Sequence, residues 1–99
     1  MKVVWSARSR QRVVEIARYI AQDSSRSAER WVSDLFAAVA RLSDFPLLGK
    51  SARDVSVAGV RELVVGDYRV FYEVGTEVVV LTIRRASQLL VEQEFDPGD

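Results

Sequence analysis

The stretch VRELVVGDYRVFYEVGTEVVVLTIRR, residues 60–85, decides the fold. It contains three runs rich in β-branched and aromatic residues, at 60–65, 68–74 and 77–85. The runs are separated by Gly66-Asp67 and Gly75-Thr76, and glycine with a polar partner between such runs is a strong signal for a tight hairpin turn. The stretch therefore predicts three antiparallel strands joined as a meander.

Upstream of the meander, the sequence predicts a short strand and two helices. Val3-Val4-Trp5 favours a strand, and the hydroxyl of Ser6 can cap the helix that follows. Apolar residues recur at three- and four-residue steps over 7–22 and again over 28–42, which predicts two amphipathic helices. Because the break at residues 23–25 is short, we expect the two helices to form an antiparallel hairpin.

The predicted sheet carries apolar residues on both of its faces. Strict alternation of side chains places Phe71 and Tyr72 on opposite faces of the sheet, and it places Ile83 on the same face as Leu81. Two helices can cover only one face of a sheet. We expect the other face to be buried by the C-terminal tail or by another chain. The alternative is that the tail and an irregular loop predicted at 50–58 complete the burial.

Composition limits both the number of domains and the available chemistry. The chain has 99 residues, of which 48% are hydrophobic, and this predicts a single domain over 1–99. It has no cysteine and no histidine, so it lacks disulfides, thiol nucleophiles, the commonest metal ligands and the usual general base. We expect no metal and no cofactor. Neither a signal peptide nor a membrane-spanning segment is visible, so we expect a cytoplasmic protein without membrane contact.

Charge is balanced overall but uneven along the chain. Fourteen basic and fourteen acidic residues give a net charge of zero, which argues against wholesale binding of nucleic acid. After Arg85 every charged residue is acidic: Glu92, Glu94, Asp96 and Asp99. We therefore expect a mobile acidic tail over 92–99.

Several short motifs follow one another in a fixed order. They are Tyr19-Ile20-Ala21, Ala28-Glu29-Arg30-Trp31, Phe45-Pro46 with Gly49-Lys50, Gly59-Val60-Arg61-Glu62-Leu63 and Gly66-Asp67-Tyr68-Arg69-Val70-Phe71-Tyr72-Glu73-Val74. Their order and spacing over nearly the whole chain resemble the RelE/ParE toxins of type II toxin-antitoxin systems. The resemblance implies an α+β fold, with a helical hairpin packed on an antiparallel sheet. It also implies a cognate ParD-like antitoxin that wraps the toxin and supplies the DNA binding, so that the toxin meets DNA only indirectly.

Members of this superfamily divide between cleavage of messenger RNA on the ribosome, as in RelE, and inhibition of DNA gyrase, as in ParE. Many relatives carry Arg-His-Gly-Arg where this chain has Arg84-Arg85-Ala86-Ser87, and RNA-cleaving members place a histidine or tyrosine near the carboxyl terminus. Residues 87–95 contain neither. This departure favours a ParE-like gyrase inhibitor that acts by binding. The alternatives are a RelE-like endoribonuclease and an inactive antitoxin-binding module.

The resemblance also gives candidate site residues. We expect binding to the target or antitoxin at Arg61, Arg69, Tyr72, Arg84 and Arg85. In a ribonuclease, Arg61, Arg84 and Arg85 would stabilise the phosphate, because the guanidinium group matches phosphate oxygens. Tyr72, Lys50, Glu62 and Glu73 are the groups that could act as acid or base.

Each candidate also has a structural explanation. The arginines on neighbouring strands can form cross-strand ion pairs with Glu62 and Glu73. Tyr68 and Tyr72 are more often core aromatics than catalytic groups, and Trp31 lies on the apolar stripe of the second helix. For the active toxin, the resemblance implies growth arrest as the outcome and plasmid stabilisation as one role.

Overall fold

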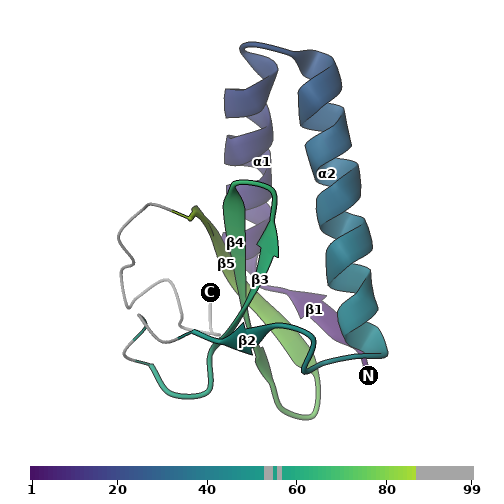
Figure 1. The fold of residues 1–99 in the computed structure, drawn as a ribbon, viewed down its shortest axis with the longest axis vertical. Helices are drawn as coiled ribbons and strands as arrows, with labels where there is room; N and C mark the ends of the chain where they lie inside the picture. The colour runs from purple at the N-terminus through teal and green to yellow at the C-terminus, as the bar shows by residue number, and fades with distance from the viewer. Residues whose placement is uncertain (53–54, 56, 87–99) are drawn as a thin grey trace.

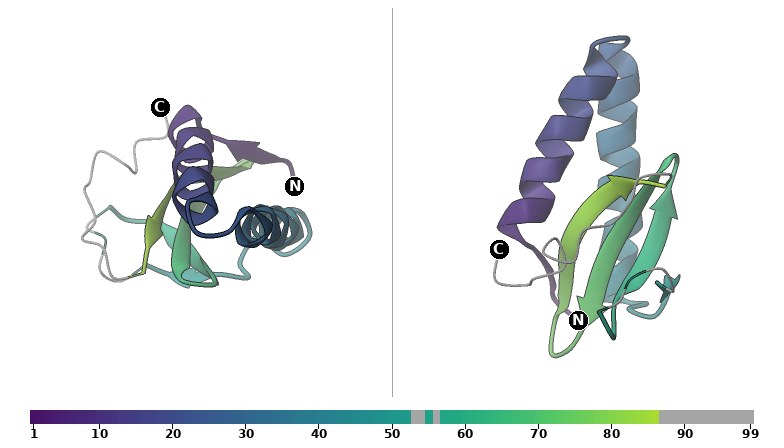
Figure 2. Two further views of the ribbon diagram at one scale, coloured as in Figure 1. Left: turned by 90° about the horizontal axis from the view of Figure 1, so that it is seen from above. Right: turned by 90° about the vertical axis from the view of Figure 1, so that its left-hand side faces the viewer.

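Two helices lie side by side on one face of a five-stranded sheet in the computed structural model (Figures 1 and 2), which describes residues 1–52, 55 and 57–86. The elements are β1 (Val3–Trp5), α1 (Ala7–Ala21), α2 (Ser25–Ala40), a 3-10 turn η1 (Arg41–Ser43), β2 (Lys50–Ser51), β3 (Arg61–Val65), β4 (Tyr68–Val74) and β5 (Val78–Arg85). The predicted α+β class, the helical hairpin and the meander are confirmed. No helix among the described residues is long and apolar enough to cross a membrane.

The strand order in the sheet is β1-β5-β4-β3-β2. The meander strands pair antiparallel, whereas β1 runs parallel to β5, with Val3 beside Val78 and Trp5 beside Val80. The short β2 pairs antiparallel with β3 through Lys50 opposite Glu62. The prediction of an irregular loop from residue 50 was therefore wrong for its first two residues, because they add to the sheet edge.

Two serine caps set the start of the helices. Ser6 Oγ accepts a hydrogen bond from Ser9 N at 3.0 Å and begins α1 as predicted. Ser24 Oγ accepts from Ser27 N at 3.1 Å, so α2 begins at Ser25 rather than at the predicted Ala28. The residues that interrupt the apolar pattern are the cap and first turn of the second helix.

The main core lies between the helices and the sheet. It contains three almost fully buried residues of α2 and η1, namely Leu35, Val39 and Leu42. Residues of β4 and β5 are buried in the same cluster. Trp31 packs on Tyr68 with ring centroids 5.2 Å apart, which confirms its predicted packing role. This core fixes the hairpin against the sheet and so determines which side chains remain at the surface.

A β-bulge reverses the alternation of side chains in β5. Phe71 lies opposite Thr82, but Tyr72 lies opposite Val80, so Leu81 is an extra residue in the ladder. Ile83 consequently packs in the main core on the helix side, while Leu81 packs on the other face. The prediction that Leu81 and Ile83 share one face was wrong, because it assumed an unbroken period of two.

A second apolar cluster lies on the face of the sheet away from the helices. Phe71 and Leu81, both 0% exposed, form a second cluster with Ala52 and Val60, and Val55 and Val57 pack against it. Described residues of the 52–60 loop therefore pack on this face, as the alternative expected of the predicted loop. The predicted acidic tail lies outside the described residues.

Candidate functional site

The five predicted site residues fall into three groups by the contacts they make. Arg61 and Tyr72 contact the turn after α2, Arg69 and Arg84 lie opposite each other on neighbouring strands, and Arg85 contacts α1. Arg84 and Arg85 line the same pocket. The structure therefore does not bring all five together around one reacting group.

Tyr72 and Arg61 hold the 45–49 turn, defined as residues Phe45 to Gly49. The Tyr72 hydroxyl donates to Pro46 O and accepts from Gly49 N, each at 2.9 Å. The Arg61 guanidinium donates to Leu47 O at 3.2 Å and also to Gly49 O. Tyr72 itself is 0% exposed, its bond with Gly49 N is buried, and its bond with Pro46 O is partly buried. The two side chains therefore fix the backbone of this turn.

Replacing Tyr72 by phenylalanine is expected to lower the free energy of unfolding by about 1–2 kcal/mol, because the buried Gly49 N–H and the Pro46 carbonyl lose their partner. Urea unfolding followed by circular dichroism measures the change. Tyr19→Phe is the matched control, since Tyr19 is 52% exposed, and it is expected to stay within about 0.5 kcal/mol. Equal effects at the two positions would mean that the Tyr72 hydroxyl does not stabilise the turn.

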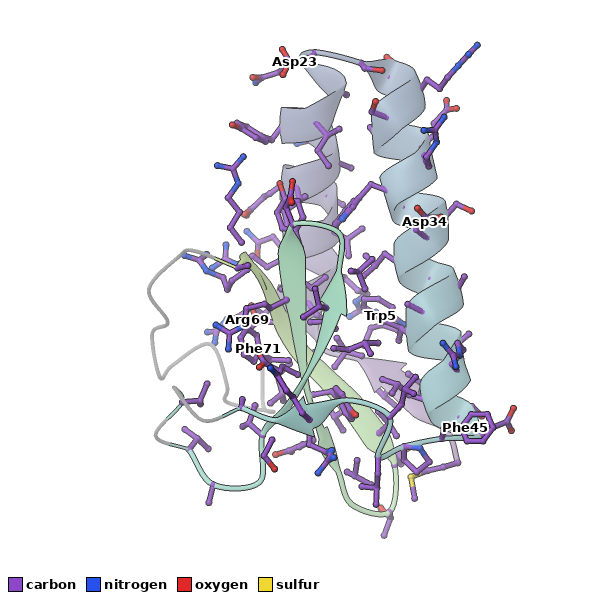
Figure 3. All side chains as sticks on the ribbon, in the orientation of Figure 1. Trp5, Asp23, Asp34, Phe45, Arg69 and Phe71 are labelled. Carbon is purple, nitrogen blue, oxygen red and sulfur yellow. The ribbon has the colours of Figure 1, made fainter. Side chains whose placement is uncertain are left out.

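An ion cluster lies on the sheet face away from the helices. Arg69 Nε donates to Glu62 Oε2, and the two side chains are 11% and 8% exposed. The Arg69 guanidinium also lies 4.7 Å from the ring centroid of Phe71, a cation–π contact (Figure 3). Lys50 Nζ lies 3.8 Å from the second carboxylate oxygen of Glu62. The predicted cross-strand ion pair with Glu62 is confirmed for Arg69, but it is buried rather than solvated.

Arg85 lies on the opposite face from Arg69 because of its place in the strand after the bulge. Its guanidinium donates to Tyr19 Oη at 3.3 Å and lies 5.1 Å from the centroid of that ring. The hydrogen bonds that Arg85 donates to Tyr19 and then to Tyr68 raise the pKa of Arg85 above its ordinary value. A pocket of about 230 Å³ beside it is lined by Arg12, Glu15, Ile16, Tyr19, Tyr68, Ile83, Arg84 and Arg85.

An apolar groove runs between the helices near their connection. Its volume is about 560 Å³, and it is lined mainly by small residues. Ala17 and Ala21 come from α1, and Ala28 and Val32 come from the amino-terminal half of α2. Small side chains at these positions leave room for the side chains of another polypeptide. No cluster of acidic residues that could hold a metal ion occurs within the part of the chain that the structure describes.

A family model described as ParE toxin of the type II toxin-antitoxin system parDE matches residues 3–90. The chain belongs to the ParE toxin family. A Sinorhizobium fredii (strain NBRC 101917 / NGR234) protein named "Putative toxin Y4kP" is 33% identical over 89 residues, which cover 88% of this chain and 90% of that protein. A solved structure, the chromosomal ParDE toxin-antitoxin system from P. aeruginosa, superposes with a TM-score of 0.71 at 25% identity. The superposition covers 86% of this chain and 95% of that one.

Sequence reasoning missed several contacts that join distant parts of this ParE toxin. Tyr19 was noted only as part of a motif, yet it stacks on Arg85. Gly49 was noted in the same way, yet its backbone receives bonds from both Tyr72 and Arg61. Ser6 donates its hydroxyl to Leu81 O at 2.9 Å and so ties the start of α1 to the bulge in β5. These contacts join residues far apart in the sequence, so no local pattern could have indicated them.

Proposed function

We propose that this ParE toxin arrests growth by binding and inhibiting DNA gyrase, and that a ParD-like antitoxin encoded beside it neutralises it. The observation that favours gyrase over RNA as the target is the environment of the Tyr72 hydroxyl. Its hydroxyl is fully buried and already makes two hydrogen bonds to the backbone of the 45–49 turn. A group held in this way is poorly placed to move protons on a substrate.

Two other groups expected of a ribonuclease are also engaged. The buried Glu62 is paired with Arg69, and Arg61 donates to backbone carbonyls of the turn. The chain contains no histidine to serve as general base. Inhibition by binding needs none of this proton chemistry, so the geometry supports a gyrase inhibitor better than an endoribonuclease.

The antitoxin is proposed from family membership and from the helical hairpin. The groove between α1 and α2 is concave and apolar, which suits a chain that lays an apolar face across the toxin. The net charge of zero fits a toxin that does not itself bind DNA. In this proposal, DNA contact in the toxin-antitoxin complex comes from the antitoxin.

Two assays on the purified protein test the choice of target. We expect inhibition of gyrase supercoiling, with accumulation of cleaved DNA, and no cutting of messenger RNA on translating ribosomes. Expression of the toxin alone should arrest growth, and expression with the neighbouring antitoxin gene should restore it. Cut message with normal supercoiling would replace this proposal by ribonuclease activity. Folded protein without effect on growth would leave only an antitoxin-binding module.

A further inference from the structure

The 45–49 turn exposes three large apolar side chains. The exposed fractions are 59% for Phe45, 66% for Leu47 and 40% for Leu48. Together with Pro46, these residues form the continuous segment 45–48. Figure 3 shows Phe45 projecting away from the fold just past the carboxyl-terminal end of α2. Exposed apolar side chains gathered in one place mark an interaction site far more often than single ones do.

The backbone that carries these side chains is fixed from several directions. Phe45 N donates to Arg41 O at 2.9 Å, and Leu48 N donates to Phe45 O at 3.0 Å. Tyr72 and Arg61 bind four further backbone groups of the turn, namely Pro46 O, Leu47 O, Gly49 N and Gly49 O. A rigid turn loses little conformational entropy when it binds, so its apolar side chains contribute more of their burial energy to affinity. The hydrogen bonds of Tyr72 thus hold the backbone that carries these apolar side chains.

The chemistry of the turn points to a protein partner. Phenylalanine and leucine side chains cannot pair with phosphate, whereas they fill apolar pockets at the centre of protein interfaces. Charges beside the turn are mixed, with Arg41 and Lys50 against Asp44, so they do not select a polyanion. The exposed side chains of the turn therefore match an apolar pocket on a protein better than a nucleic acid.

The position of the turn separates it from the groove between the helices. The groove lies along the amino-terminal half of α2, and the turn lies beyond the other end of this helix, which is about 24 Å long. One apolar surface is concave and suits a chain that wraps the toxin, whereas Phe45 projects and suits insertion into a pocket. Two surfaces so placed can serve two different partners.

We propose that the 45–49 turn is the surface through which this toxin contacts DNA gyrase, with Phe45 and Leu47 entering an apolar pocket on a gyrase subunit. The inference rests on the proposed function, because it names the contact surface for that target. Tyr72 and Arg61 are positioning residues in this arrangement. Their part is to hold the turn, and they do not themselves touch gyrase.

The test compares two full-length double variants. Phe45→Ser with Leu47→Ser removes the proposed contacts, and Val14→Ser with Val64→Ser removes two exposed apolar side chains elsewhere, which are 48% and 61% exposed. Circular dichroism and urea unfolding establish that both proteins are folded. We expect the concentration for half inhibition of supercoiling to rise at least tenfold for the turn variant and to change less than twofold for the control.

Affinity for the antitoxin, measured by calorimetry, is expected to be unchanged in the turn variant. Unchanged inhibition of gyrase by the turn variant would overturn the inference while leaving the proposed function intact. A parallel loss of antitoxin affinity would also overturn it, because the turn would then belong to the antitoxin interface. Wild-type protein without effect on gyrase would remove the proposed function itself and the inference with it.

Discussion

Replacing Phe71 by alanine is expected to lower the free energy of unfolding by about 3–5 kcal/mol. Phe71 is 0% exposed and forms a cluster with Ala52, Val60 and Leu81 on the sheet face away from the helices. The substitution leaves a cavity between the sheet and the 52–60 loop, and it also removes the cation–π contact with Arg69. Urea unfolding followed by circular dichroism measures the loss.

Phe45→Ala provides the matched control, because it makes the same chemical change at a residue that is 59% exposed. We expect it to change the free energy of unfolding by less than about 0.5 kcal/mol. If Phe71→Ala were as mild as this control, the cluster under the 52–60 loop would contribute nothing to stability. The loop would then be a loose cover rather than a second core.

The second large effect is expected for Gly49→Ala, at about 3 kcal/mol of destabilisation. A Cβ atom at this position would lie 2.3 Å from Glu62 O and 2.8 Å from the Tyr72 hydroxyl. The first of these neighbours is backbone of β3, so it cannot move aside as a flexible side chain would. The 45–49 turn must shift away from the sheet, and it then loses the hydrogen bonds of Tyr72.

Gly75→Ala is the control for this substitution, since no atom lies within 4 Å of the added Cβ there. It is expected to be neutral within about 0.5 kcal/mol in the same urea experiment. A well-tolerated Gly49→Ala would show that the turn can leave the sheet at little cost. The rigid presentation of Phe45 and Leu47 would then lose its basis.

Most of the local structure could be predicted from the sequence because the signals are local. The period of three and four residues identified both helices, and the Gly66-Asp67 and Gly75-Thr76 pairs located both turns of the meander. Ser6 was predicted as a cap and is one. The start of α2 was predicted three residues too late. Consecutive serines such as Ser24-Ser25 are equally typical of a turn between helices and of a helix cap.

The arrangement of the elements in space was harder to predict. Nothing local indicates that β1 runs parallel to β5, because that pairing depends on where α1 and α2 return the chain. The bulge at Leu81 has no sequence signal of its own, yet it decides which face receives Ile83, and Arg85 after it. A single extra residue in one strand was enough to make the prediction of faces wrong.

The contacts of the candidate site residues could not be predicted from the sequence either. Residue types and family resemblance selected Arg61 and Tyr72, but their partners are backbone atoms of Pro46, Leu47 and Gly49. A sequence shows which side chains can donate hydrogen bonds, but it does not show which carbonyl will lie nearby. Their interpretation as residues that position a turn therefore required the structure.

The pairing of β1 with β5 has a consequence for synthesis of the toxin. Val3–Trp5 is synthesised well before its partner residues 78–80, so the nascent chain cannot complete its sheet before β5 is translated. Every shorter chain has an unpaired strand edge and an uncovered apolar stripe on α1, features that favour aggregation and degradation. Translation that stops before β5 therefore releases fragments without the complete sheet.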